Sequence, residues 1–378
     1  MGYYTKGLEE AERLYKQNAD SARALRDVSV CLGKLGSFLT ERGQPGDADL
    51  ALGYYTRDLE ITERLAKLTP DSTETARDFL VSLGRFGDLL SKRHHPGDAD
   101  LALGYYTRSF EEAGRLLKKN PDSAQASRDV SVVLGRLGDS LSKRDRPGDA
   151  DRALGYFTQK LEINERLLKL NPNSILSTRD VWESHEYLGN FYVRLGNFDT
   201  AIESFQNGID VLEVMIAKKW YVKQSIERKA FLERRMSFCR VADLATGDWA
   251  ALHNIDAEYI PQLLRIRVAA LAKSENLAEL AQAGAQLREL APRTNGNLYN
   301  AACAYGLCAT QIGKGKQGLT EVEQAEQRSY LELALTCLKH AVAAGYNDFD
   351  HMKQDTDLTP LRDLPEFEAL FPKPTNQK

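Results

Sequence analysis

The sequence predicts an all-α protein, a solenoid built from antiparallel helix pairs, and three observations predict it. One phrase, Ala-Leu-Gly followed by two aromatic residues and Thr, returns at intervals of 51 residues, beginning at Ala51, Ala102 and Ala153. A second phrase, Pro-Gly-Asp-Ala-Asp, keeps the same interval from Pro45 onwards. Between these phrases, apolar residues recur at spacings of three and four, the period of one helical face. A fixed interval of roughly 20–50 residues is typical of stacked repeat architectures.

The second repeat shows how the first helix of each unit is defined. Pro70 stops the preceding helix, and Ser72 is the expected N-cap of the next one, because its hydroxyl can accept a hydrogen bond from a free backbone N–H. From there to about Arg93, apolar residues keep the helical spacing. This pattern predicts a helix of about 20 residues with one buried face.

A second helix is expected to follow the Pro-Gly break of each repeat. Asp98 or Asp100 is expected to cap it, and Asn120 to end it. Gly84 and Gly87 lie inside the first helix, although glycine costs about 1 kcal/mol against alanine there. Because the glycine pair returns in the other repeats, we predict that the missing side chains let a neighbouring helix approach.

Beyond residue 219 the regular interval is lost, and this change sets the predicted domain limits. Residues 1–219 are expected to form the regular array, 220–292 an irregular helical segment with a degenerate repeat, and 293–378 a C-terminal helical module. The helices expected after the array lie at 222–245, 260–272, 277–290, 298–312 and 330–344. A turn is expected at Gly247, and a polar loop at 313–318 leads into an acidic helical turn.

Composition and charge exclude several functional classes. The formal charge is −4, from 50 basic and 54 acidic residues that are interspersed, which argues against a general nucleic-acid or anionic-membrane binder. No run of 18 apolar residues could cross a membrane, and no signal-peptide pattern opens the chain. Five cysteines without a CxxC pair stand in apolar helical contexts, which favours reduced thiols over disulfides or a zinc site. We therefore expect a cytoplasmic protein.

The fourth unit carries a pattern that resembles the tetratricopeptide repeat (TPR) family. The matching residues are, in order, His185, Leu188, Gly189, Tyr192, Ala201, Phe205 and Gly208. The resemblance extends over most of the regular array, whose repeats have longer helices and a turn three residues longer. It implies a right-handed superhelix that binds a protein or peptide on the concave face lined by the first helices. Tyr55, Tyr106 and Phe157 fill the aromatic place of the second helix, which favours helix packing over an aromatic cage.

The last block of the chain resembles a second, more specific pattern. It runs from Leu298-Tyr299-Asn300 to Pro360-Leu361-Arg362, and it is similar to the module that ends TPR regions in large multidomain bacterial proteins, many with a serine/threonine kinase domain. This resemblance implies an alternative function, the regulatory or sensor arm of a bacterial signalling or defence effector, a kinase or protease. The sequence contains no kinase motif, so such an effector would belong to another domain or chain.

The TPR resemblance places a partner-binding surface along the first helices. The residues that it assigns to the concave face are Lys34, Ser37, Arg85, Asp88, Lys92, Arg136, Asp139, Lys143, Asn190 and Arg194. Asn190 falls where peptide-carboxylate-binding TPR proteins carry asparagine, whereas the other clamp positions hold Gly, Asp or Ser. This departure disfavours capture of a C-terminal carboxylate. The Arg-Asp pair that recurs in every first helix, such as Arg77-Asp78, is expected to bond adjacent repeats, for instance at the loop before the next second helix.

No motif indicates catalysis, a cofactor or a metal. The stretch Gly313-Lys314-Gly315-Lys316 lacks the following Ser or Thr and the preceding strand of a phosphate-binding loop, so we interpret it as a connector. His94-His95 has no other His or Cys at ligand spacing, which favours a solvent-facing loop. The sequence therefore predicts a non-catalytic interaction scaffold with a protein or peptide partner and with no cofactor, metal, nucleic acid or membrane.

In the repeat register, the first residues of the chain correspond to the second helix of a repeat. Leu8, Ala11, Leu14 and Tyr15 make an apolar stripe there, with no preceding first helix to cover it. Solenoid ends normally carry a polar cap. We therefore expect either a missing N-terminal region or self-association through this edge.

Overall fold

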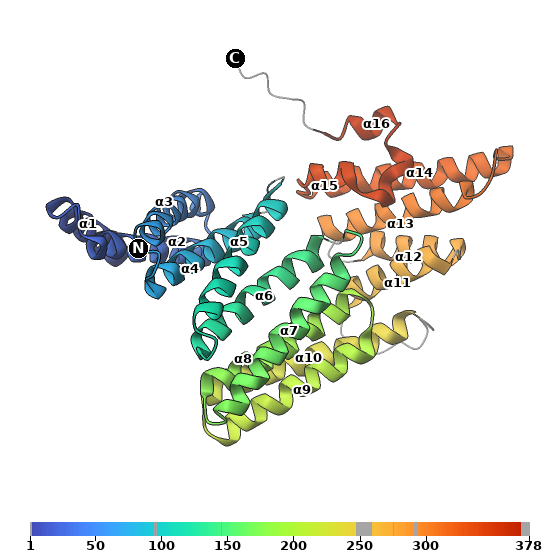
Figure 1. Ribbon diagram of the computed structural model, residues 1–378. Helices are drawn as coiled ribbons and strands as arrows, with labels where there is room; N and C mark the ends of the chain where they lie inside the picture. Colours follow the sequence, from blue (N-terminus) through green and yellow to red (C-terminus); the bar gives the residue numbers. More distant parts are fainter. Residues whose placement is uncertain are drawn as a thin grey trace, which may run out of the picture. The chain divides into compact units, whose positions relative to one another are not determined.

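The computed structural model describes residues 2–93, 95, 97–144, 146–246, 259–274, 276–290 and 294–371. Over these residues all regular structure is helical, without a strand (Figure 1). Contacts divide the chain into two compact units, Met1–Arg234 and Arg235–Lys378. The predicted all-α solenoid of helix pairs is confirmed, whereas the three domain limits drawn from the sequence stay a prediction. The expected turn at Gly247 and the first histidine of His94-His95 lie outside the described residues.

The first unit is a succession of helices joined by short turns (Figure 1). The helices are α1 Gly2–Gln17, α2 Ala22–Arg42, α3 Asp47–Leu68, α4 Thr73–Arg93, α5 Asp98–Lys119, α6 Ala124–Arg144, α7 Asp149–Leu170, α8 Ile175–Arg194, α9 Phe198–Ala217 and the first half of α10, Val222–Thr246. The closest packing lies within the pairs α2–α3, α4–α5, α6–α7 and α8–α9, the first and second helices of successive repeats. As expected, the Ser72 hydroxyl accepts a hydrogen bond from the N–H of Thr75 at the start of α4.

Glycines on the first helices let the second helices come close. A β-carbon added at Gly87 would lie 2.6 Å from the ring of Tyr106, and one added at Gly138 would lie 2.6 Å from the ring of Phe157. The two rings are only 4% and 2% exposed. The predicted reason for the glycines is therefore confirmed for these positions, as is the packing role of the aromatic residues.

An arginine bound to an aspartate closes the turn inside each 51-residue repeat. Arg93 donates two hydrogen bonds to Asp98, at 2.8 Å from Nε and 2.7 Å from Nη2, and the backbone N–H of His95 donates a third at 3.1 Å. Gly97, with φ of 82°, occupies the N-cap position of α5. The expectation that Asp98 or Asp100 caps α5 is therefore wrong, because Asp98 is the first helical residue and its carboxylate holds the turn instead. The equivalent pairs are Arg42–Asp47 and Arg144–Asp149.

Further arginine–aspartate pairs join the first helices of neighbouring repeats. Arg77 on α4 donates from Nε to Asp129 on α6 at 2.9 Å, and Arg128 on α6 donates to Asp180 on α8 at 2.6 Å. The predicted bond between adjacent repeats is thus confirmed. Its position differs from the one expected, because the arginine reaches the next first helix rather than the loop before the next second helix.

The first helix lays part of its apolar stripe on α2. Leu8 and Ala11 are 8% and 6% exposed, and they belong to one buried cluster with Val28. Tyr15 packs against the same cluster, whereas Leu14 is 46% exposed. The expectation of an uncovered stripe is therefore wrong for three of its four residues, because α2 provides the covering surface.

The second unit is built around one central, almost fully buried helix. It comprises the end of α10, α11 Ile260–Ser274, α12 Leu277–Glu289, α13 Asn295–Gly313, α14 Glu321–Ala343, α15 Phe349–Gln354, the 3-10 helix η2 Thr356–Leu361 and α16 Pro365–Glu368. These helices confirm the ones expected from the sequence, including the acidic turn that opens α14. The buried face of α13 is rich in Ala, Cys and Tyr, and it packs on α12, α14 and η2.

Two further sequence predictions concern thiols and membranes. All five cysteines are free, and four of them, Cys239, Cys303, Cys308 and Cys337, are buried, as their apolar contexts predict. No helix in the described part of the chain is long and apolar enough to span a bilayer.

Candidate functional site

A polar hollow opens on α4, α6 and α8, the first helices of three successive repeats. Its volume is about 490 Å³. The lining residues are Asp88, Ser91 and Lys92 on α4, Tyr106 on α5, Val132, Arg136, Asp139 and Lys143 on α6, Lys160 on α7, and Glu183 and Tyr187 on α8. The second helices α5 and α7 thus contribute two side chains, Tyr106 and Lys160, and each of these is only 4% exposed.

The structure gathers half of the sequence-predicted surface in this hollow. Five of the ten residues line it: Asp88, Lys92, Arg136, Asp139 and Lys143. Arg194 reaches its edge through an ion pair with Asp139 at 3.6 Å. Lys34, Ser37, Arg85 and Asn190 lie on α2, α4 and α8 but do not line the hollow. The assignment of all ten residues to partner binding stays a prediction.

Asp88 holds one side of the hollow in place. Arg136 donates two hydrogen bonds to its carboxylate, at 2.9 Å from Nε and 2.7 Å from Nη2, and the Tyr106 hydroxyl donates a third at 2.9 Å. Such a fork-shaped pair fixes the orientation of both groups. A β-carbon at Gly84 would lie 2.5 Å from Nη1 of Arg136, so this glycine makes room for the arginine of the next repeat.

Asp139 occupies the same place one repeat later but has different partners. Lys143 donates to its carboxylate at 2.5 Å from the next turn of α6. Phe157 stands where the preceding repeat has Tyr106, so this position of α7 has no hydroxyl to donate to Asp139. The charges of Arg136 and Lys143 are therefore both compensated by aspartates inside the hollow.

The position of Lys160 in the repeats is polar and buried each time. Asp58 stands at this position in the first 51-residue repeat, and its carboxylate accepts a hydrogen bond from Ser82 at 2.8 Å. Ser109 stands there in the second, and its hydroxyl donates to the carbonyl of Leu80 at 3.1 Å. In both cases the buried polar group is satisfied from within the protein, as buried polar groups usually are.

Lys160 departs from that pattern. Its Nζ lies 5.4 Å from the centre of the Tyr187 ring, a cation–π contact. Among the residues that the structure describes, none accepts a hydrogen bond from this amine or forms an ion pair with it. Burial lowers the pKa of the Lys160 amine, against the attraction of Glu183 and Asp180. A buried lysine at the base of the hollow is thus left without an acceptor.

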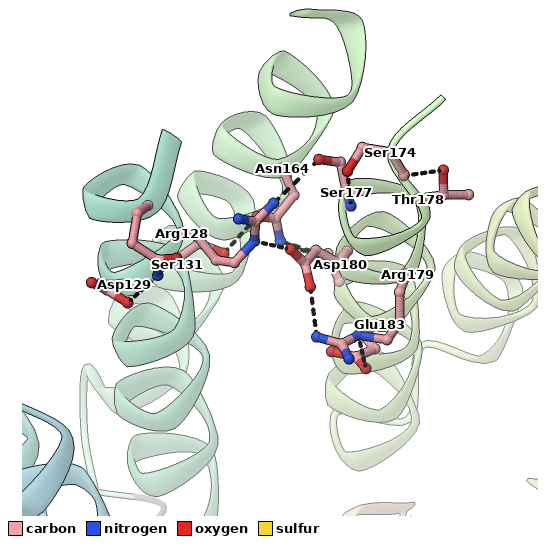
Figure 2. A network of polar contacts seen from close by, with 12 residues as sticks. Arg128, Asp129, Ser131, Asn164, Ser174, Ser177, Thr178, Arg179, Asp180 and Glu183 are labelled. Atoms are coloured by element: carbon pink, nitrogen blue, oxygen red, sulfur yellow. Dashed lines mark hydrogen bonds and ion pairs between the residues drawn. The ribbon is translucent and has the colours of Figure 1, made fainter. Parts of the chain in front are cut away.

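The two acidic residues that attract the Lys160 amine most strongly are Glu183 and Asp180, and each forms an ion pair with an arginine. Figure 2 shows Arg128 reaching Asp180, and Arg179 turned toward Glu183 on its own helix, at 3.3 Å between Nε and the carboxylate. Partial burial raises the pKa of Glu183, and Arg179 opposes this shift more than Lys160 does. In the described part of the chain neither acid accepts a hydrogen bond from Lys160, although both attract its amine electrostatically.

The polar network beside the hollow fixes α6, α7 and α8 against one another. Asn164 on α7 accepts a hydrogen bond from Ser131 at 2.7 Å, and it donates to Ser184 at 2.8 Å and to the carbonyl of Asp180 at 3.0 Å (Figure 2). Because the amide uses both its donor and its acceptor, it sets the spacing of three helices at once. The three helices α6, α7 and α8, which all contribute to the lining, are therefore joined to one another beside the hollow.

A second, apolar hollow of about 470 Å³ lies at the other end of α8. Its lining residues are Ile175, Leu176, Arg179, Trp182, Leu212, Met215, Tyr221, Gln224 and Ser225. The buried indole N–H of Trp182 has no acceptor in the described part of the chain. Tyr221 has φ of 44°, in the left-handed region that costs about 1–3 kcal/mol for a residue other than glycine.

One group of side chains in the second unit has the chemical types of a metal site. The ligand atoms of Cys303, Asp355 and Asp357 lie within 4.8 Å of one another. The Tyr299 hydroxyl and the Cys303 thiol both donate to Asp355, at 2.7 and 3.5 Å. Burial and the neighbouring Asp355 raise the pKa of the Cys303 thiol well above its usual range. The arrangement is that of a hydrogen-bonded core cluster.

The sequence interpretation missed six lining residues of the hollow, Ser91, Tyr106, Val132, Lys160, Glu183 and Tyr187. A signal existed for Lys160, because alignment of the repeats places a lysine where Asp58 and Ser109 stand. A signal existed for Tyr187 as well, because it keeps the 51-residue register with Arg136.

The sequence matches no protein-family model and no curated protein. One similar solved structure is that of Nro1, described as a nuclear import adaptor and hypoxic regulator of sterol synthesis. It is 14% identical to this chain, and the match covers 98% of this chain and 99% of that chain with a TM-score of 0.34. A circular tandem repeat protein has 14% identity, coverage of 97% and 88%, and a TM-score of 0.29. Yeast Tom70 has 13% identity, coverage of 96% and 86%, and a TM-score of 0.28. At these TM-scores the likeness carries no argument about function.

Proposed function

We propose that this protein is a non-catalytic scaffold that binds a protein or peptide partner along the face lined by its first helices. The observation that carries the proposal is the polar hollow on α4, α6 and α8, which brings together five residues that the sequence assigns to the concave face. Three consecutive repeats contribute to it, so an extended segment crossing the repeats would meet it. The five free cysteines fit a reducing compartment such as the cytoplasm.

The chemistry of the hollow favours binding over catalysis. Its lining contains neither histidine nor cysteine, and Ser91 therefore has no imidazole there to activate it as a nucleophile. Asp88 and Asp139 already accept hydrogen bonds from Arg136 and Lys143. Groups fixed in this way lose little further freedom when a partner binds, which is how a rigid repeat surface gains affinity.

Site-specific photo-crosslinking tests the proposal. A photoreactive amino acid at Val132, which is 42% exposed and lines the hollow, is expected to capture a partner in the source cell. The matched control places the same residue at Leu101 on α5, which is 55% exposed and outside the hollow, and it is expected to capture nothing specific. Addition of Arg136→Glu to the Val132 variant should abolish the crosslink. Equal capture at both positions, or capture at Leu101 alone, would contradict the proposal.

A further inference from the structure

We propose that the hollow on α4, α6 and α8 receives an acidic side chain of the bound peptide, an aspartate or glutamate whose carboxylate docks on Lys160. This inference rests on the proposed function, because it identifies what part of a peptide partner the hollow recognises. It assigns a ligand-contacting role to a residue of a second helix, whereas the sequence interpretation placed partner binding on first helices alone.

The first argument is that the Lys160 amine lines the hollow and has no hydrogen-bond acceptor among the described residues. A buried charge without a hydrogen-bonding partner is costly, and proteins keep such groups rarely unless they are paired. The side chain of Lys160 is 4% exposed. Among the described residues, its amine has one polar contact, the cation–π contact with the Tyr187 ring. The same repeat position holds Asp58 and Ser109 elsewhere, and both are satisfied. The fold therefore accepts at this position a polar residue whose hydrogen bonds come from within the protein. A lysine is not needed there for the helices to pack.

The charge balance of the hollow gives the sign of the ligand. Its lining carries four basic residues, Lys92, Arg136, Lys143 and Lys160, and three acidic ones, Asp88, Asp139 and Glu183, which leaves one net positive charge. Arg136 and Lys143 are paired with the two aspartates, and Glu183 is paired with Arg179. Lys92 is exposed and lies at the mouth of the hollow without an ion pair among the described residues. Lys160 is therefore the buried cation of the lining that has no ion pair among the described residues.

The hydroxyl groups of the hollow complete a carboxylate site. Tyr187 places its ring against Lys160, and burial raises the pKa of its phenol to about 12, so the hydroxyl stays protonated and can donate. Ser91 supplies a second hydroxyl in the lining. A carboxylate carries a negative charge that can pair with the Lys160 amine, and it accepts several hydrogen bonds.

Selection from a library of short random peptides tests this inference. All peptides are N-acetylated and C-terminally amidated, so that side chains supply the only carboxylates, and a parallel library keeps a free C-terminus. The full chain is compared with Lys160→Met, which keeps the length of the side chain without its charge. The control is Lys169→Met, which removes an equal charge from an exposed residue of the same helix α7 outside the hollow. Lys160→Ser serves as a second variant, because Ser109 shows that the repeat folds with serine there.

The expected result is enrichment of Asp or Glu at one position of the bound capped peptides. Affinity for such a peptide should fall about tenfold in Lys160→Met and Lys160→Ser, the loss typical of a hydrogen bond to a charged group, and should change little in Lys169→Met. Peptides bound without acidic enrichment, or enrichment that persists in both Lys160 variants, would overturn the inference and leave the scaffold function intact. Enrichment confined to the library with free C-termini would also overturn it. Failure of every peptide to bind would overturn both proposals.

Discussion

The two units of this protein hold their helices together by different means. In the first unit, charged pairs recur at the repeat interval and link neighbouring helices, as Arg77–Asp129 and Arg128–Asp180 do. In the second unit, α13 is buried along most of its length, and its core cluster consists mainly of Leu, Ala, Cys and Tyr. The comparison teaches that the regular unit places polar groups at fixed intervals between helices. A single departure from that regularity, such as Lys160, therefore leaves a polar group unsatisfied.

Loss of the turn aspartate is expected to have the largest effect on stability. Asp98→Ala removes the acceptor of three hydrogen bonds and leaves the Arg93 guanidinium, whose side chain is 16% exposed, without its partner. Breaking such a pair from one side costs about 3 kcal/mol in the free energy of unfolding. Urea denaturation measures the change, and the double variant Arg93→Met/Asp98→Leu is expected to recover much of it. A loss below about 1 kcal/mol would contradict the role given to this turn.

Filling a glycine contact of the first unit is expected to have the next largest effect. In Gly87→Ala the new methyl group would lie 2.6 Å from the Tyr106 ring, so α4 and α5 must separate, at a cost of about 2 kcal/mol. Gly104 provides the control, because nothing lies within 4 Å of the added β-carbon there. Gly104→Ala should stabilise α5 by about 0.5–1 kcal/mol. If the two variants shifted the unfolding midpoint in the same direction, close helix approach would not explain the glycine at 87.

A smaller effect is expected from the pairs that join neighbouring repeats. The side chain of Arg77 is 44% exposed, and solvent weakens its pair with Asp129. Arg77→Met should therefore cost only about 0.5–1 kcal/mol. Hydrogen exchange followed by mass spectrometry is expected to show faster exchange in α4 and α6 and no change in α13. A loss as large as that of Asp98→Ala would show that the ladder, rather than the turn, dominates stability.

The smallest expected effect is a difference between the two units in how their stability depends on pH. Arg144 holds the pKa of Asp149 at about 2, so its stabilising contribution is present above the usual aspartate pKa and is lost as the pH falls from about 4 to 2. Burial raises the pKa of Asp357 to about 6, so the contribution of its neutral form is present below about pH 4 and is lost as the pH rises to 6. Acidification from pH 6 to 4 should therefore raise the protection factors for hydrogen exchange around η2, which correct for the intrinsic slowing of exchange at low pH. Protection that responds to pH equally in Asp357→Asn and in the unmodified chain would contradict this assignment.

The sequence carried most of the information about the helices and less about the contacts between them. The 51-residue interval located the helices of the regular array, because each repeat has the same pattern. Helical spacing alone located α10 to α14, whereas the short helices α15, η2 and α16 were not predicted. The turn chemistry at Asp98 was misjudged, because an aspartate at a helix start serves equally well as an N-cap or as the partner of Arg93. The contact of Cys303 with Asp355 joins residues 52 positions apart outside any repeat, and no local pattern announces it.

For the hollow, the sequence predicted the first-helix residues because family resemblance points to that face. Lys160 was not predicted to line the hollow, because a lysine on a second helix is normally interpreted as solvent-exposed helix surface unless its burial is known. The lesson is particular to repeats. A position that changes chemical type from Asp58 to Ser109 to Lys160 deserves comparison across repeats, since the surrounding packing stays the same while the charge does not.

The central claim is that Lys160 serves a ligand and not the fold, and the stability of Lys160→Met tests it most directly. Removal of a desolvated and unpaired charge should raise the free energy of unfolding in urea by about 1 kcal/mol at neutral pH. Lys143→Met, which only loses an exposed pair with Asp139, should leave it nearly unchanged. A more stable Lys160→Met protein would agree with the account. A protein destabilised by 1 kcal/mol or more would contradict it, because Lys160 would then be part of what holds the repeats together.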